Sequence, residues 1–346
     1  MLKKIKYFFL LILVIGVAVG GYLISLDSEF KVVRSRQIDA PANLVYQQIA
    51  NLKNWDKWAP WKDKDSLIKF EFSESTGKEG DYFRFTDADG NRQKLTNLTL
   101  SPDSLIVQSL LSNETTQEYK WHIKPNDNGV SVSWTVSGEL PLTQRFFAKQ
   151  MDELMGPSMV RGLELIDRSV HQDMAKHEMT ILKPVDLSAT YYLYKSASCK
   201  MDSLGKYLDK LLPDVIIYAV KNQIETNGKP FVIYHKRDKA NNSVIFSASI
   251  PTKEKVTVND AGILTGQNPG GHYLKVKYQG AYKYLGDAWD KSYQYIASNE
   301  QFIPDTTRDP FEVYAVGHTQ SLNPADWITY LYIPVIEVEP KEMTVE

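Results

Sequence analysis

Side chains capable of covalent or metal chemistry are few and scattered in this sequence. The single cysteine, Cys199, can neither close an internal disulfide nor supply a cluster of thiolate zinc ligands. The histidines show no metal-binding spacing, and no His-Glu-x-x-His, Cys-x-x-Cys, Gly-x-Ser-x-Gly or Gly-x-x-x-x-Gly-Lys-Ser/Thr motif occurs. We therefore predict no metal, no cofactor and no catalytic residues, although enzymatic activity stays open. A Ser/His/Asp triad escapes such a search because its members meet only in the folded protein.

Aromatic side chains are the chemical groups that this chain has in excess, with 20 Tyr and 7 Trp. Aromatic faces bind apolar molecules, and they bind cations through cation–π contacts worth ~0.5–2 kcal/mol. Fifteen of the tyrosines follow Thr190, whereas five of the tryptophans precede it. The candidate ligand-binding residues are Tyr192, Tyr194, Phe231, Tyr234, Trp289, Tyr293, Trp327, Tyr330 and Tyr332. At least half of them could equally be ordinary core or sheet residues.

The overall charge excludes one class of partner. Lys and Arg number 40 against 42 Asp and Glu, which gives a net charge of -2. Binding to nucleic acid requires a clustered positive field, so we predict no nucleic-acid partner. Helix-turn-helix signals are also missing. The oligomeric state is not predictable from these features.

The N-terminus carries a membrane-spanning signal. The stretch Tyr7–Leu26 holds no charged residue, lysines precede it, and it is long enough to cross a bilayer as a helix. The positive-inside rule then predicts a single-pass inner-membrane anchor over residues 1–29, with a cytoplasmic N-terminus and periplasmic soluble domains. Two alternatives are a signal peptide cleaved near residues 18–20 and a buried core helix.

The first soluble domain, residues 30–178, alternates short strands after one early helix. A strand at 30–38 and a helix whose cap and early proline are Asp39–Pro41 lead into a segment with Trp55, Trp58 and Trp61. Short alternating runs follow, the first at 67–72, and a long amphipathic helix reaches Met174. Such a sheet wrapped round a helix encloses a cavity. The tryptophans either plug one end of this core, line its mouth or touch a membrane.

Two stretches of this domain carry a resemblance. Val32–Trp61 and Ser133–Glu139 resemble START-like (SRPBCC, polyketide cyclase/dehydrase-type) domains. The resemblance implies a helix-grip fold with an apolar cavity. It implies no catalytic residues, because the family shares no catalytic set.

The second soluble domain, residues 179–340, contains an internal repeat at about 187–255 and 268–337. Leu204–Lys210 reappears at Leu285–Lys291, and Pro230–Tyr234 reappears at Pro310–Tyr314. The matched segments keep their order, with offsets of 80 to 83 residues. Each half is predicted as strand, helix and strands, the first helix ending at Leu212. Two copies would form one sheet with both helices on one face and a pocket on the opposite face and at the seam.

This duplicated domain resembles the gyrase-inhibitor-like family, which is also the effector-binding domain of AraC- and MerR-type regulators. Gly271–Gly280 and Thr329–Pro334 carry the resemblance. It implies binding of small molecules that are often aromatic or cationic, and a few relatives are hydrolases. Many members have a pocket Glu in the last strand where this chain has Tyr330, which puts cation pairing and hydrolysis in doubt. Glu312, in a neighbouring strand, could take the place of this pocket Glu. However, its neighbours Phe311 and Val313 are apolar, and strand alternation then indicates that Glu312 points outward.

Together these features predict an α+β protein with three parts and a short tail. The parts are the transmembrane helix, a helix-grip antiparallel sheet around a long C-terminal helix, and the duplicated effector-binding domain with pseudo-twofold symmetry; residues 341–346 form the tail. The predicted function is a membrane-anchored protein that binds small apolar or aromatic molecules in two cavity-forming domains. The alternatives are a hydrolase or cyclase acting on a small apolar substrate, and an envelope interaction protein with filled pockets.

Overall fold

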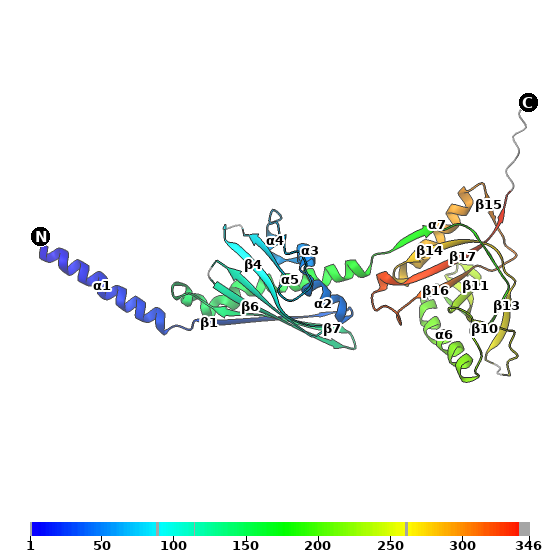
Figure 1. The fold of residues 1–346 in the computed structure, drawn as a ribbon, viewed down its shortest axis with the longest axis horizontal. Helices are drawn as coiled ribbons and strands as arrows, with labels where there is room; N and C mark the ends of the chain where they lie inside the picture. Colours follow the sequence, from blue (N-terminus) through cyan, green and yellow to red (C-terminus); the bar gives the residue numbers. More distant parts are fainter. Residues whose placement is uncertain (1, 88–89, 114, 260–261, 339–346) are drawn as a thin grey trace, which may run out of the picture. The chain divides into compact units, whose positions relative to one another are not determined.

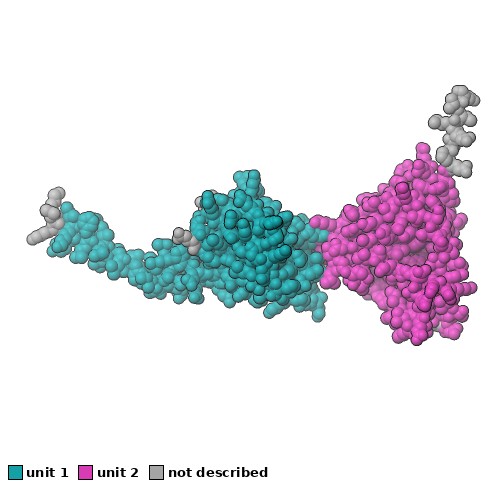
Figure 2. All heavy atoms as spheres, in the orientation of Figure 1, with its two compact units in different colours: residues 1–173 teal, residues 174–346 magenta. Residues whose placement is uncertain are grey.

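The protein divides into two compact units. The computed structural model describes residues 2–87, 90–113, 115–259 and 262–338. Residues 1–173 form unit 1 and residues 174–346 form unit 2, as coloured in Figure 2. The predicted tail, 341–346, lies outside the described residues.

The N-terminal helix α1, Leu2–Ser25, contains an apolar candidate membrane span (Figure 1). Its segment Ile5–Ser25 has a mean hydropathy of 2.5 and no buried residues, so the alternative of a buried core helix is wrong. The length and composition of this segment fit a membrane anchor and a signal sequence equally.

Unit 1 contains a seven-stranded antiparallel sheet in the order β1-β7-β6-β5-β4-β3-β2. The strands are β1 Glu29–Ile38, β2 Glu71–Phe72, β3 Tyr82–Thr86, β4 Arg92–Ser101, β5 Leu105–Ser112, β6 Thr115–Asn126 and β7 Gly129–Glu139. The run at 67–72 was expected to be a full strand, but only its last two residues pair. The last strand, β7, pairs antiparallel with the first strand, β1, along the whole length of β1.

The helices of unit 1 place apolar side chains against that sheet. They are α2 Ala42–Ala50, α3 Trp55–Trp58, α4 Pro60–Lys64 and the long α5 Met151–Met174, which follows the 3-10 segment Leu142–Gln150. The inner stripe of α5 includes Met159, Leu163, Ile166 and Val170, all buried. Pro157 lies inside this helix, within its second turn. The expected long closing helix is therefore present, and with the 3-10 segment before α5 helical structure runs from Leu142 to Met174.

Tryptophans fill the interior of unit 1. Trp55 and Trp58 are buried with ring centroids 4.1 Å apart, and Trp121 stacks on Trp134 at 4.3 Å. The indole of Trp55 donates to the backbone oxygen of Ile49, and that of Trp58 donates to the oxygen of Gln48. The packing interpretation of these tryptophans is thus correct for Trp55 and Trp58.

Unit 2 is built on a second antiparallel sheet whose order shows the internal repeat. The path is β13-β10-β12-β11-β16-β17-β14-β8, with the two copies joined between β11 and β16. The strands of the path are β8 Glu178–Ile181, β10 Thr190–Lys200, β11 Phe231–Asp238, β12 Ser243–Thr252, β13 Leu264–Asn268, β14 Gly271–Gln279, β16 Phe311–Val316 and β17 Ile328–Glu337. Two short strands lie off this path: β9, Val185–Leu187, pairs with β14, and β15, Phe302–Pro304, pairs with β17. The expected single sheet of two similar halves is confirmed.

Helices α6, Leu204–Lys221, and α7, Leu285–Ser298, pack on the same face of this sheet. Leu208 of α6 and Trp289 of α7 belong to one buried apolar cluster with Val232 and Leu331 of the strands. The prediction that the first helix ends at Leu212 is wrong. The helix continues through Pro213, because Val215 and Ala219 beyond it are also buried against the sheet.

Candidate functional site

The seam between the two repeats is the starting point of the site. Strands β11 and β16 pair over only three residues, Phe231–Ile233 with Phe311–Val313. The N–H of Tyr234 also donates to the oxygen of Pro310, and β11 then continues to Asp238 paired with β12, with a bulge between Tyr234 and Lys236. The sheet is therefore open on one side of the seam.

Glu312 lies in the short paired segment, and its side chain faces the helices. It is 1% exposed, so the expectation that it points outward is wrong. Its neighbours Phe311 and Val313 do lie on the opposite face, but that face is itself packed, with Phe231, Tyr273 and other apolar residues. Apolar flanks indicate which residues share a face; here they could not show which face is outside.

Three donors satisfy the buried carboxylate. The hydroxyls of Tyr234 and Tyr314 donate to Oε1 at 2.6 and 2.5 Å, and the indole of Trp289 donates to Oε2 at 3.0 Å. Burial raises the pKa of Glu312, while these hydrogen bonds and the charge of Arg237 act in the opposite direction. Burial also holds the pKa of both tyrosines well above the ordinary value, so both remain donors.

Arg237 covers this cluster with its positive charge. The guanidinium carbon lies 4.8 Å from the ring centroid of Trp289 and 5.3 Å from that of Tyr234. Tyr293, one turn further along α7, stacks on Trp289 with centroids 6.2 Å apart. The aromatic faces of Trp289 and Tyr234 are therefore already in contact with a cation of the protein itself, the Arg237 guanidinium.

A pocket of about 730 Å³ opens beside Arg237. Its wall comes from both repeats: the end of β11, the outer part of α7, the loop before β16 and the end of β17. The lining residues are Tyr234, His235, Lys236, Arg237, Lys239, Asp290, Tyr293, Gln294, Pro304, Asp305, Thr306, Arg308, Asp309, Pro310, Ile333 and Pro334. This pocket lies at the seam, and because α7 helps to form its wall, it opens on the helix side of the sheet. A ligand site on the opposite face of the sheet stays a prediction.

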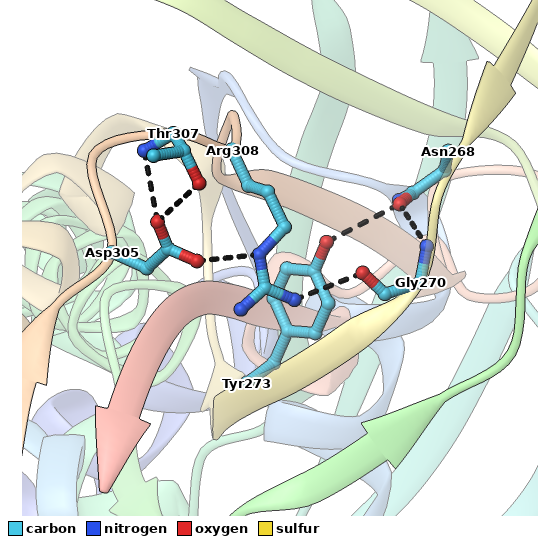
Figure 3. Close-up of polar contacts among 6 residues, drawn as sticks. All are labelled: Asn268, Gly270, Tyr273, Asp305, Thr307 and Arg308. Carbon is cyan, nitrogen blue, oxygen red and sulfur yellow. Dashed lines mark hydrogen bonds and ion pairs between the residues drawn. The ribbon is translucent and has the colours of Figure 1, made fainter.

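The loop 304–310 is held in place by a chain of polar contacts (Figure 3). Asp305 accepts from the backbone and hydroxyl of Thr307 and from Nε of Arg308 at 2.7 Å. These bonds lower the pKa of Asp305 to about 2. Arg308 also donates to the oxygen of Gly270, and its guanidinium lies over the ring of Tyr273. One edge of the pocket is therefore fixed to Gly270 and Tyr273, at the start of β14 in the same repeat.

A Ser-His-Asp chain lies at the rim of the same pocket. Nδ1 of His235 is 2.6 Å from Oδ2 of Asp309, and Nε2 is 2.7 Å from Oγ of Ser247. Ser196 extends the chain, with its Oγ 2.9 Å from that of Ser247. With Nδ1–H donating to the carboxylate, Nε2 accepts from the serine hydroxyl, which is the connectivity of a hydrolytic triad.

The structure distributes the nine predicted ligand residues over three places. Tyr234 and Tyr293 line the pocket, and Trp289 lies under Arg237. Trp327 packs on Tyr282, away from the pocket lining, at a centroid distance of 4.7 Å. The remaining five lie on the sheet face opposite the helices: Tyr192, Tyr194, Phe231, Tyr330 and Tyr332.

Sequence reasoning missed Arg237, Asp290 and the loop 304–310. One available signal was the repeat offset of 80 residues, which makes Tyr234 and Tyr314 equivalent and places Val232 opposite Glu312 at the seam. No comparable signal existed for Arg237, because the bulge that follows Tyr234 sets its direction. Among the described residues, no group of His, Cys, Asp or Glu could hold a metal ion.

Comparison with known proteins assigns unit 2. Residues 183–336 match the family of GyrI-like small molecule binding domains, so the C-terminal part is such a domain. The resemblance seen in the sequence is confirmed for this part, and unit 1 has no family assignment. No curated protein matches the chain.

Solved structures show partial likeness to this chain. The C-terminal domain of EcmrR is 17% identical with a TM-score of 0.40, and the match covers 47% of this chain and 99% of that one. Protein CV1439 from Chromobacterium violaceum is 17% identical (TM-score 0.33; 41% and 97% covered), and SA2116 from Staphylococcus aureus is 13% identical (0.36; 43% and 97%). At these values the likeness gives no functional information.

Proposed function

We propose that this protein binds a small molecule through unit 2 and is held at a membrane by α1. The observation that carries the proposal is the pocket of about 730 Å³ at the seam, to which both repeats contribute. A volume of this size suits a drug-sized molecule. The family match to small molecule binding domains supports the same interpretation.

We propose a small aromatic or apolar molecule as the occupant, held against the aromatic and apolar part of a lining that is otherwise polar and charged. Tyr293 is 38% exposed although it stacks on a buried tryptophan, so part of its ring is available for contact. Pro304, Ile333 and Pro334 are the other apolar groups of the lining that the ligand could contact. Polar groups around the rim would then fix the orientation of the ligand.

Native mass spectrometry of the full chain, extracted from cell membranes into nanodiscs, tests this function. We expect a small-molecule adduct on the wild-type protein that is lost in Gln294→Trp, because Gln294 lines the pocket. Ser298→Trp, an exposed change further along α7 and outside the lining, is the matched control. Absence of an adduct on the wild-type protein would contradict binding at this pocket. Equal amounts of adduct on Gln294→Trp and Ser298→Trp would contradict it too.

For unit 1 we propose a START-like helix-grip domain whose interior is filled. The support is the order of its strands and the long α5 packed on the sheet. Stacked Trp121 and Trp134, together with Trp55 and Trp58, occupy the centre of this core. We assign ligand binding to unit 2 and a structural role to unit 1, in place of two working cavities.

We propose that α1 remains attached as a single-pass anchor, with the two units periplasmic. The support is the charge-free span that follows lysines. The intact mass of the mature chain tests this: a mass that includes residues 1–26 is expected, and a chain that begins after residue 20 contradicts it. Cysteine accessibility from the periplasmic side would test the orientation.

A second candidate function, hydrolysis of small esters, is favoured by the chain from Asp309 through His235 to Ser247. In that reaction Ser247 Oγ would attack the acyl carbon while His235 takes its proton and passes it to the leaving alcohol, and water would then release the acid. Ser247 is only 1% exposed, so we rank this function below binding. A fluorophosphonate probe that labels wild type but not Ser247→Ala, with Ser198→Ala as control, would establish it; equal labelling of both variants would exclude this serine.

A further inference from the structure

The charged groups around the pocket are paired, with two exceptions. Asp290 pairs with Lys239, Asp305 with Arg308, and Asp309 with His235. Every carboxylate of the lining therefore already has a basic side chain as its partner. Arg237 and Lys236 are the two lining cations that form no ion pair within the described part of the chain.

Of these two cations, only Arg237 faces the helices. It pairs across the strands with Val244, which belongs to the helix-side core, whereas Lys236 pairs with the exposed Ile245. Arg237 is half-buried, and its guanidinium donates no hydrogen bond to any of the residues described. The N–H donors of this half-buried guanidinium therefore lack a protein acceptor, and they can donate to a ligand in the pocket.

The packing of Arg237 fixes its orientation in advance. Its guanidinium lies over the rings of Tyr234 and Trp289, and both rings are tied to the Glu312 carboxylate by hydrogen bonds. The two rings stand at 82° to each other, so the guanidinium lies in the corner between them. Its planar fork of N–H groups matches the two oxygens of a carboxylate. Little side-chain freedom then remains to be lost on binding.

The same contacts work against a cationic ligand. Glu312 is 1% exposed and both of its oxygens accept hydrogen bonds from protein donors, so a ligand cation has no access to it. The aromatic faces that would hold such a cation already hold Arg237. Like-charge repulsion with Arg237 would add to the cost.

We propose that the ligand of this pocket is an aromatic or apolar carboxylate, with its oxyanion on Arg237 and its apolar part against Tyr293, Ile333 and Pro334. This inference rests on the proposed function and names its ligand class. It reverses the charge that the gyrase-inhibitor-like resemblance implies for the ligand. The ligand charge is reversed because Arg237, a residue of the protein, occupies the position that a ligand cation would take.

Three naphthalene probes of nearly equal shape test the ligand class. They are 2-naphthoate, the neutral 2-naphthamide and the cationic 2-naphthylmethylammonium, titrated by calorimetry into the full chain in nanodiscs, with empty nanodiscs as the blank. We expect 2-naphthoate to bind at least about tenfold more tightly than the amide, as a charge-assisted hydrogen bond predicts. The cation should bind more weakly than both.

Two charge-removing variants locate the effect. Arg237→Gln should abolish the preference for naphthoate over the amide, whereas Lys291→Gln, which removes a positive charge from an exposed residue of α7 outside the lining, should preserve it. Equal binding of naphthoate and amide to the wild type, or a preference for the cation, overturns the ligand class while the binding function stands. A wild-type protein that binds none of the probes overturns both, and an unchanged preference in Arg237→Gln removes Arg237 from the site.

Discussion

Tyr234 and Tyr314 donate hydrogen bonds to the same oxygen of Glu312, one from each repeat. They occupy equivalent positions, 80 residues apart, on either side of the seam. At the centre of the seam, Val232 pairs with Glu312, so the two repeats differ at the position where they meet. A single carboxylate thus organises side chains from both copies, and through Tyr234 and Trp289 it sets the platform on which Arg237 lies.

Removing either tyrosine hydroxyl should destabilise unit 2. Tyr234→Phe and Tyr314→Phe each withdraw one donor from a buried carboxylate, and we expect a loss of about 1–3 kcal/mol in the free energy of unfolding. Urea denaturation followed by near-ultraviolet circular dichroism measures it. Tyr207→Phe, which alters an exposed side chain, should change stability by less than about 0.5 kcal/mol. Losses no larger than this control would show that Glu312 is not held by these hydroxyls.

The pH dependence of stability should report Glu312. Burial raises the pKa of its carboxyl above the ordinary value of 4.5, so ionisation costs more in the folded than in the unfolded protein. The contribution of this group is therefore fully present below about pH 4.5 and is lost as pH rises through the folded-state pKa. The glutamine in Glu312→Gln does not ionise, so the variant does not lose stability in this way. The free energy of unfolding of wild type minus that of the variant should therefore fall between pH 5 and pH 8. A stability difference that stays constant, or rises, over that interval contradicts the raised pKa.

The loop 304–310 should loosen when Arg308 can no longer bridge it to Gly270. Arg308→Lys keeps the charge, but it cannot donate to both Asp305 and the Gly270 oxygen in the observed geometry. We expect faster amide hydrogen exchange at Thr307 and weaker binding of 2-naphthoate. Arg161→Lys, which alters an exposed ion pair in unit 1, should leave both measurements unchanged. Unchanged exchange in Arg308→Lys would mean that other contacts hold the loop.

The core of unit 1 should be sensitive to one buried amide. Gln108 accepts from the indole of Trp121 and donates to Asn97, and both the glutamine and the asparagine are fully buried. Gln108→Leu leaves two buried polar groups unpaired, so the free energy of unfolding should drop by about 2 kcal/mol or more. Gln172→Leu on the exposed side of α5 serves as the comparison. Equal stability of the two variants would contradict the network.

Much of the architecture could be predicted, because hydrophobic periodicity and the repeat are local or collinear signals. The sheet of unit 2, with both helices on one face, follows from segments such as Pro230–Tyr234 and Pro310–Tyr314. Pro213 misled the prediction of α6, since tertiary burial of Val215 and Ala219 outweighs the cost of a proline inside the helix. Short strands also escaped prediction in part, as β2 shows with its two paired residues.

The site could be predicted only in part. Aromatic composition pointed to Tyr234, Trp289 and Tyr293, and the repeat pointed to the seam. The direction of Glu312 could not be derived, because both faces of this sheet are packed and strand alternation does not say which one the helices cover. Arg237 depends on a bulge and on contacts between the two repeats, and neither leaves a pattern in the sequence.

Photo-crosslinking is the measurement that tests the central claim most directly. A diazirine derivative of 2-naphthoate, irradiated with the full chain in nanodiscs and mapped by peptide mass spectrometry, reports where a small aromatic acid binds. We predict labelling at residues 290–294 and 304–310 that excess 2-naphthoate suppresses and that Gln294→Trp abolishes. Labelling confined to unit 1, or to the sheet face that carries Tyr192 and Tyr330, would contradict the claim that the seam pocket of unit 2 is the binding site.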